Sequence, residues 1–198
     1  MTNNGVDATI CVVCGRNEKL KAELESCDWD AVLRGEHRDR KKGLLSRFRR
    51  KRSKALQDAM DQSKETVNGS ERKSRVKVVG LGFITRMAEY MVAADILVSK
   101  AGPGTIAEAA AVGLPVMLTS YLPGQEAGNV DFVLDNEFGD FADDPVAIGE
   151  EVATWLQDAE LMRKMSEKAT EAGRPNAAAE IVLDIGARTQ TWMALNES

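Results

Sequence analysis

Short apolar runs alternate with longer amphipathic stretches along most of the chain, and many of the turns between them contain glycine. Runs rich in apolar residues predict short strands at 9–14, 76–79, 96–98 and 116–118, the first of them buried. Each run is followed by a stretch that predicts a helix. A polar region separates the first helix from the second run. Strands that alternate with helices are typical of a parallel sheet covered by helices, so we expect an α/β fold. Parallel sheets bind ligands at the carboxyl ends of their strands.

Seven segments predict helices. Their expected ranges are 18–26, 85–94, 105–112 and 126–136, with three more that begin after Asp144, Asp158 and Pro175, the last ending near Thr189. An Asp N-cap followed by Pro is a favourable helix start, and Asp144-Pro145 has this form. Thr85 is expected to cap its helix, and Gly113 is expected to end another.

The composition excludes several classes of protein. The 198 residues suffice for one ordinary domain, and no apolar run approaches the ~18 residues of a membrane span. Three cysteines are too few for a disulfide framework, which indicates a reducing compartment. The first residues resemble no targeting segment, so composition alone predicts a cytoplasmic protein. Cys11 and Cys14 lie in an apolar run and are interpreted as core residues rather than a metal or redox pair. Trp155, Trp192 and Met193 are also expected to pack in the core.

Basic residues are concentrated in one region that interrupts the pattern. Eleven Lys and Arg residues lie between Arg34 and Lys54 against two acids, so this window carries +9 although the chain carries −5. Dense charge of one sign resists burial. We therefore interpret residues 31–75 as a basic, solvated and disordered insertion in a domain that spans 8–198. Binding to anionic lipid headgroups is the leading functional alternative, because an interface with nucleic acid would be expected to contain more aromatic residues than Phe48 alone.

The strongest candidate site is Ser99–Ala109, where a strand ends and a helix begins. The amides at a helix N-terminus attract phosphate, and Gly102 and Gly104 allow close approach of the backbone. Pro103 has no N–H, so the expected donors are the amides of residues 104–106, with the Thr105 hydroxyl in addition. Glu108, one turn later, could accept hydrogen bonds from a ribose diol. The residues Thr105-x-x-Glu108 equally form a capping box, in which both side chains serve the helix itself.

Two further turns after strands carry weaker signals. Gln125, Glu126 and Asn129 group polar donors and acceptors within one helical turn, which suits a polyhydroxylated ligand, although an ordinary polar helix start is the simpler interpretation. Gly80–Ile84 could expose backbone groups to the edge of a base. Phe83 in this turn could also simply pack in the core.

Four blocks of this sequence together resemble the monogalactosyldiacylglycerol synthases, which are GT-B enzymes of glycosyltransferase family 28. The blocks are Gly82–Thr85, Lys100–Ala109, Gly113–Pro115 and Gly124–Asn129. The resemblance implies a Rossmann-like sheet that forms the C-terminal, donor-binding half of a two-domain enzyme, without the N-terminal domain. It also implies transfer of galactose from UDP-galactose to diacylglycerol at a plastid membrane.

The resemblance also assigns roles in a UDP-sugar site. Backbone near Phe83 and Ile84 would hold uracil, and Glu108 would hold the ribose. The diphosphate would bind at Gly102, Pro103, Gly104 and Thr105. The sugar would bind at Gln125, Glu126 and Asn129. No cofactor, metal ligand or catalytic residue of this chain is implied.

The chain also departs from the family pattern. The strand and glycine-rich loop that open the family's C-terminal half do not precede Thr9, and the lone histidine, His37, lies in the basic insertion. The catalytic base and the lipid acceptor site are therefore expected from an N-terminal half or a partner chain. Two alternatives stay open: a non-catalytic UDP-sugar-binding subunit completed by another chain, and a fragment whose basic arm binds anionic surfaces.

Overall fold

The computed structural model describes residues 7–33 and 76–196. These residues form two units, one up to Phe83 and one from Ile84 onward, and each is described by itself. Nearly all of the predicted insertion, residues 34–75, lies outside the described residues, so its predicted disorder stays a prediction.

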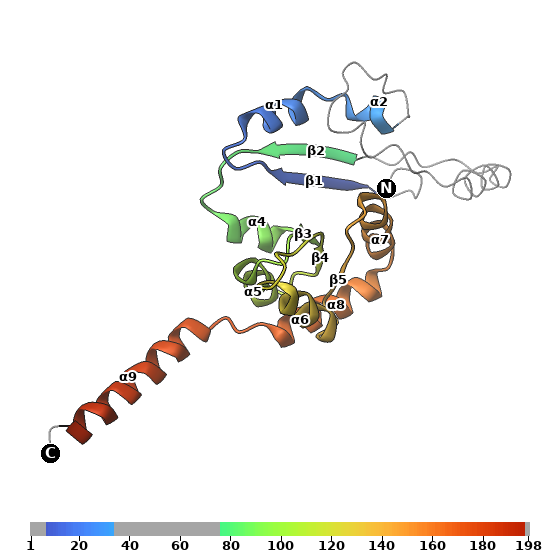
Figure 1. Cartoon of the computed structure of the whole chain (residues 1–198). Coiled ribbons are helices and arrows are strands. Elements are labelled where there is room, and N and C mark those ends of the chain that lie inside the picture. The colour runs from blue at the N-terminus through green and yellow to red at the C-terminus, as the bar shows by residue number, and fades with distance from the viewer. Residues whose placement is uncertain (1–6, 34–75, 197–198) are drawn as a thin grey trace. The chain divides into compact units, whose positions relative to one another are not determined.

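The first unit is built on two parallel strands, β1 (Ala8–Val13) and β2 (Val76–Leu81), paired in register from Ala8 opposite Val76 (Figure 1). Helices α1 (Glu18–Ser26) and α2 (Trp29–Leu33) contact β2. The bounds of α1 agree with the prediction.

The expected burial of the first strand is wrong. No residue of β1 is buried; among the described residues, the helices α1 and α2 make their main strand contacts with β2. Cys14, directly after the strand, is buried as expected, whereas Cys11 is exposed.

The second unit contains a parallel sheet in the order β3–β4–β5 (Figure 1). Its strands are β3 (Leu97–Ser99), β4 (Val116–Leu118) and β5 (Gly139–Phe141). All residues of the central strand β4 are buried. Val116 and Leu118 join one apolar cluster and Met117 joins another, as the period of two along a strand requires. Together with the parallel pair β1–β2, this sheet confirms the predicted α/β class.

The helices of this unit connect and cover these strands. They are α4 (Met87–Ala93), α5 (Pro103–Ala111), α6 (Ala127–Asp135), α7 (Pro145–Gln157), α8 (Ala159–Ala172) and α9 (Ala177–Asn196). The side chains of α5 and α6 pack with β4 in one cluster, α7 contributes to the other, and α8 contributes to both. The crossovers β3–α5–β4 and β4–α6–β5 place the starts of α5 and α6 after neighbouring strands.

Most of the predicted helix signals are confirmed. Asp144 and Asp158 each accept two backbone N–H bonds at the starts of α7 and α8. Gly113 follows α5 with φ +70°, which favours glycine. The Thr85 cap is wrong, because α4 begins later with Arg86 at the N-cap and without a side-chain cap bond.

Helix α9 differs from the expectation at its far end. It continues to Asn196 and buries none of its residues. Trp155 of α7 is buried, as predicted, but Trp192 and Met193 are 65% and 48% exposed, so their predicted packing is wrong within the described residues. No helix in the described ranges is both long enough and apolar enough to cross a membrane.

Candidate functional site

The loops that follow β3 and β4 are hydrogen-bonded to each other. Ala101 donates its N–H to the Ser120 carbonyl at 2.8 Å, and the Thr119 N–H donates to the Ser99 carbonyl at 2.9 Å. The Thr119 hydroxyl adds a bond of 3.3 Å to the same Ser99 oxygen. The carboxyl ends of these strands, where the sequence predicts a ligand, are thereby held side by side.

The start of α5 has free backbone donors. Gly102 is the N-cap and Pro103 the first helical residue, and no side chain caps this helix. The Ile106 N–H donates to the Gly102 carbonyl at 3.0 Å, so the expectation that it is available to a ligand is wrong. The amides of Gly104 and Thr105 have no hydrogen-bond partner among the described residues. Two donors thus point out of the helix rather than three.

The alternative capping box is wrong. Because α5 begins at Pro103, Thr105 is its third residue and not its N-cap. The half-buried Thr105 hydroxyl and the exposed Glu108 carboxylate form no hydrogen bond with the described residues. Both side chains, one turn apart on α5, are therefore available to a ligand.

A lysine side chain lies over the start of α5. A Cβ built at Gly102 would be 3.3 Å from Lys100 Nζ and 3.8 Å from Thr105 Oγ1. The Lys100 side chain is 61% exposed. The ammonium therefore adds positive charge beside the positive end of the α5 dipole, which is a favourable arrangement for an anion.

Glu126 is the N-cap residue of α6. Among the acidic residues that the structure describes, it is the one that is buried, with 8% of its surface exposed. Its Oε1 forms an ion pair with Lys100 Nζ, and its Oε2 accepts the Leu122 N–H at 2.8 Å. The hydrogen bond from Lys100, and next that from Leu122, lower the pKa of the Glu126 carboxyl. Both oxygens of a side chain predicted to bind sugar are thus engaged within the protein.

The other two predicted sugar residues differ in availability. Asn129 donates its Nδ2 to the Ala101 carbonyl at 2.9 Å, which ties α6 to the start of α5. Its Oδ1 has no partner among the described residues. Gln125 is exposed, and its side chain forms no hydrogen bond with them. Of these three side chains, Gln125 therefore has the most polar groups available to a ligand.

The predicted uracil residues fall in different units. Phe83 ends the first unit and Ile84 begins the second. Phe83 is 66% exposed, with the Arg16 guanidinium 5.5 Å from its ring centroid, so the alternative that it packs in a core is wrong. An exposed ring is compatible with stacking on a base. Ile84 is half-buried.

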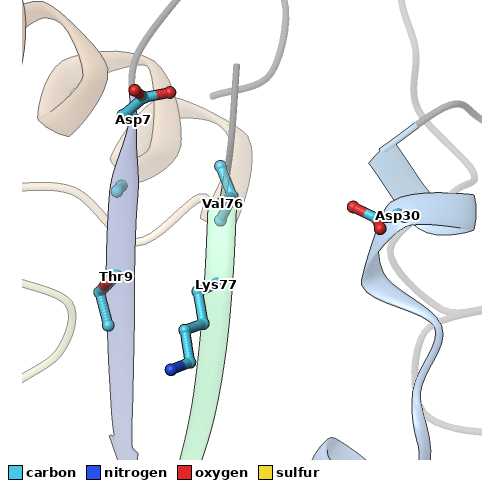
Figure 2. A pocket seen from close by; sticks show the side chains of 6 residues that line it. Asp7, Thr9, Asp30, Val76 and Lys77 are labelled. Carbon is cyan, nitrogen blue, oxygen red and sulfur yellow. The ribbon is translucent and has the colours of Figure 1, made fainter. Parts of the chain in front are cut away.

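A pocket in the first unit lies at the amino ends of the strands β1 and β2. Figure 2 shows its lining side chains at the starts of β1 and β2 and on α2, among them Asp7, Asp30 and Lys77. In parallel sheets the ligand site lies at the carboxyl ends of strands, so this pocket is not the predicted site. In the described ranges, no three His, Cys, Asp or Glu side chains are grouped to hold a metal.

Comparison with known proteins decides the family. The model of the glycosyltransferase family 28 C-terminal domain matches residues 9–181, which is most of the chain. The chain belongs to glycosyltransferase family 28. The family match covers β1, the β3–β5 sheet and both loops that form the candidate site.

Curated relatives agree with the family 28 match, and a solved structure shares the fold. Monogalactosyldiacylglycerol synthase 1, chloroplastic, of Arabidopsis thaliana is 34% identical over 89% of this chain and 25% of its own length. Monogalactosyldiacylglycerol synthase 3, chloroplastic, of the same plant is 46% identical over 61% of this chain and 26% of its own length. MurG of Acinetobacter baumannii shares the fold, with a TM-score of 0.51 at 24% identity over 60% of this chain and 36% of its own length. The chain spans about a quarter of the length of the two monogalactosyldiacylglycerol synthases.

Lys100 is the residue of the candidate site whose role the sequence did not predict. It lies within the predicted site Ser99–Ala109, but no role in binding is predicted for it from the sequence. A signal existed: Lys100 and Glu126 follow neighbouring predicted strands and carry opposite charges. Because the carboxyl ends of neighbouring parallel strands lie together, this pairing could have been anticipated.

Proposed function

We propose that this chain is the donor-binding part of a hexosyltransferase that moves galactose from UDP-galactose to diacylglycerol in glycolipid synthesis. The observation that carries the proposal is the uncapped start of α5, where the free Gly104 and Thr105 amides lie near the Lys100 ammonium. The named relatives support galactose and a diacylglycerol acceptor, because they are monogalactosyldiacylglycerol synthases.

The start of α5 would bind and stabilise the diphosphate. When the acceptor hydroxyl attacks the anomeric carbon, the bond from that carbon to the UDP oxygen breaks and UDP leaves with an added negative charge. The Gly104 and Thr105 amides can donate hydrogen bonds to that charge, and Lys100 adds an electrostatic contribution. The acceptor proton must pass to a base, which we place in the part of the synthases that this chain does not match.

Further contacts are proposed for the ribose, the sugar and the uracil. Glu108 can accept hydrogen bonds from both ribose hydroxyls, because its carboxylate is exposed one turn beyond Thr105. Gln125 and the free Oδ1 of Asn129 are proposed as sugar contacts. Backbone near Phe83 and Ile84 is proposed for uracil.

Attachment to a plastid membrane is part of the same proposal. The relatives are named as chloroplastic, and diacylglycerol is a membrane lipid. The basic window 34–54, proposed to contact anionic headgroups, lies outside the described residues. Deletion of this window should abolish salt-sensitive binding to anionic vesicles. Unchanged binding would reject this part of the proposal.

Calorimetric titration with UDP-galactose, UDP and uridine tests donor binding. We expect both diphosphates to bind and uridine to bind more weakly. Gln125→Ala should weaken binding of UDP-galactose more than binding of UDP, and equal losses would remove Gln125 from the sugar site. If neither diphosphate binds a folded chain, the proposed function is wrong.

A non-catalytic UDP-sugar-binding subunit is the second candidate, since the chain spans about a quarter of its relatives. Both candidates predict donor binding. Galactose transfer by this chain alone would reject the subunit, and it would also place the base within this chain, contrary to the assignment above. Transfer only after addition of an acceptor-binding half would favour the subunit.

A further inference from the structure

Lys100 occupies a position that helix electrostatics disfavours. A cation near the positive N-terminal end of a helix is destabilising. The Lys100 ammonium nevertheless lies beside Gly102, the N-cap of α5. Its attraction to Glu126 offsets this repulsion, so the acid determines where the cation lies.

Glu126 is held more firmly than the lysine that it binds. Its side chain is 10% exposed, compared with 61% for Lys100, and its second oxygen accepts the Leu122 N–H. One oxygen of the carboxylate thus holds the 122–126 turn in place, and the other oxygen holds the Lys100 side chain in place. Each oxygen of Glu126 thus already accepts a hydrogen bond within the protein, one from Lys100 and one from Leu122.

We propose that Glu126 is a positioning residue, which holds the Lys100 ammonium beside the free α5 amides so that all three donors meet one diphosphate. This inference rests on the proposed function and reassigns Glu126, which sequence reasoning placed on the sugar. Galactose recognition is then left to Gln125 and Asn129.

The two roles predict different ligand selectivity. A sugar ligand contributes to binding of UDP-galactose but not to binding of UDP. A residue that positions Lys100 contributes equally to both ligands and not to uridine, which has no phosphate. Glu126→Gln is the suitable change, because a Gln side chain has one acceptor oxygen and cannot serve both Lys100 and Leu122.

The experiment is calorimetry of UDP, UDP-galactose and uridine with wild type, Glu126→Gln, Lys100→Met and the double variant. We expect Glu126→Gln to weaken UDP and UDP-galactose by the same factor of about 10, which is typical for loss of a charge-assisted hydrogen bond. Uridine binding should not change. In the Lys100→Met background, Glu126→Gln should have little further effect, which a general disturbance of the loop could not produce.

Asp135→Asn is the matched control. It removes one carboxylate charge from an exposed position at the other end of α6, and should leave all three affinities unchanged. Amide exchange at Leu122 in the absence of nucleotide should become faster in Glu126→Gln but not in the control, which confirms that the turn depends on this carboxylate.

Three outcomes would overturn the proposal. Loss of UDP-galactose affinity alone would make Glu126 a sugar ligand. Unchanged or tighter UDP binding in Glu126→Gln would show that Glu126 merely competes with phosphate for Lys100. Equal losses with and without Lys100 would show a structural role only. Absence of UDP binding to wild type would instead reject the proposed function itself, together with this inference.

Discussion

Helices α5 and α7 both begin with Pro, but a side chain caps the N-terminus of α7 and none caps that of α5. Each has Pro at its first position, and the preceding N-caps have similar backbone angles, φ −71°, ψ 128° at Gly102 and φ −91°, ψ 122° at Asp144. The Asp144 carboxylate accepts the N–H groups of Val146 and Ala147, whereas no side chain caps α5.

The difference separates a helix start that stabilises the fold from one that can serve a ligand. A capping side chain typically contributes ~1 kcal/mol to stability, and α5 forgoes that contribution. Instead it has Lys100, a cation where helix electrostatics favours an anion. An uncapped start with an added cation is suited to a diphosphate from outside the protein.

The strongest test converts the start of α5 into that of α7. Gly102→Asp should allow the new carboxylate to accept the Gly104 and Thr105 amides, because the backbone angles already resemble those at Asp144. We expect UDP affinity to fall by roughly 100-fold or more, the equivalent of two charge-assisted hydrogen bonds. Calorimetry gives the affinity, and thermal unfolding confirms that the variant is folded.

Gly102→Ala is the control for that test. It adds a Cβ that must displace Lys100 Nζ by a few tenths of an ångström, without adding a cap. UDP affinity should fall much less than in Gly102→Asp. If the two variants bind UDP equally well, the free amides have no role in binding.

The second test removes the hydroxyl beside those amides. Thr105→Ala should weaken UDP binding by ~1 to 3 kcal/mol, the cost of leaving a polar partner unpaired. Thr105→Ser keeps the hydroxyl and should restore most of the affinity in calorimetry. A full loss in the Ser variant would instead assign the effect to the methyl group.

The third test removes the cap of α7. Asp144→Ala should lower the free energy of unfolding by ~1 kcal/mol, because two amides lose their acceptor. UDP affinity should not change. Chemical denaturation measures the effect, with Asp143→Ala, the loss of an exposed neighbouring acid, as the control. Equal losses of stability in both variants would contradict the capping role.

The smallest expected effect is a pH dependence. Because Lys100 and Leu122 lower the pKa of Glu126, this carboxylate contributes stability above the unfolded-state pKa of ~4.3 and loses it as the pH falls through the folded-state value. The stability difference between wild type and Glu126→Gln should therefore be constant near neutral pH and decrease below about pH 4.3. Thermal unfolding between pH 3 and 7 measures it. A difference independent of pH would contradict the ion pair.

The fold was predictable where local signals are strong. The bounds of α1 and β4 and the caps Asp144 and Asp158 follow from residue pattern and chemistry alone. The strand β5 was missed, because Gly-Asp-Phe has little strand propensity and forms a strand through its pairing with β4.

The site was predictable in its location and less so in its contacts. The glycines and Thr105 identified the start of α5, but the exact first residue decides between a capping box and free amides, and sequence locates helix ends poorly. The partnership of Lys100 with Glu126 joins residues 26 positions apart, so no local pattern contains it.

The most direct test follows individual backbone amides by NMR while UDP is added to the chain. If the diphosphate binds at the start of α5, the Gly104 and Thr105 amide signals should shift saturably, while those of Val146 and Ala147 at the capped start of α7 should not move. If UDP binds while the Gly104 and Thr105 signals stay in place, the diphosphate lies elsewhere and the central claim is wrong.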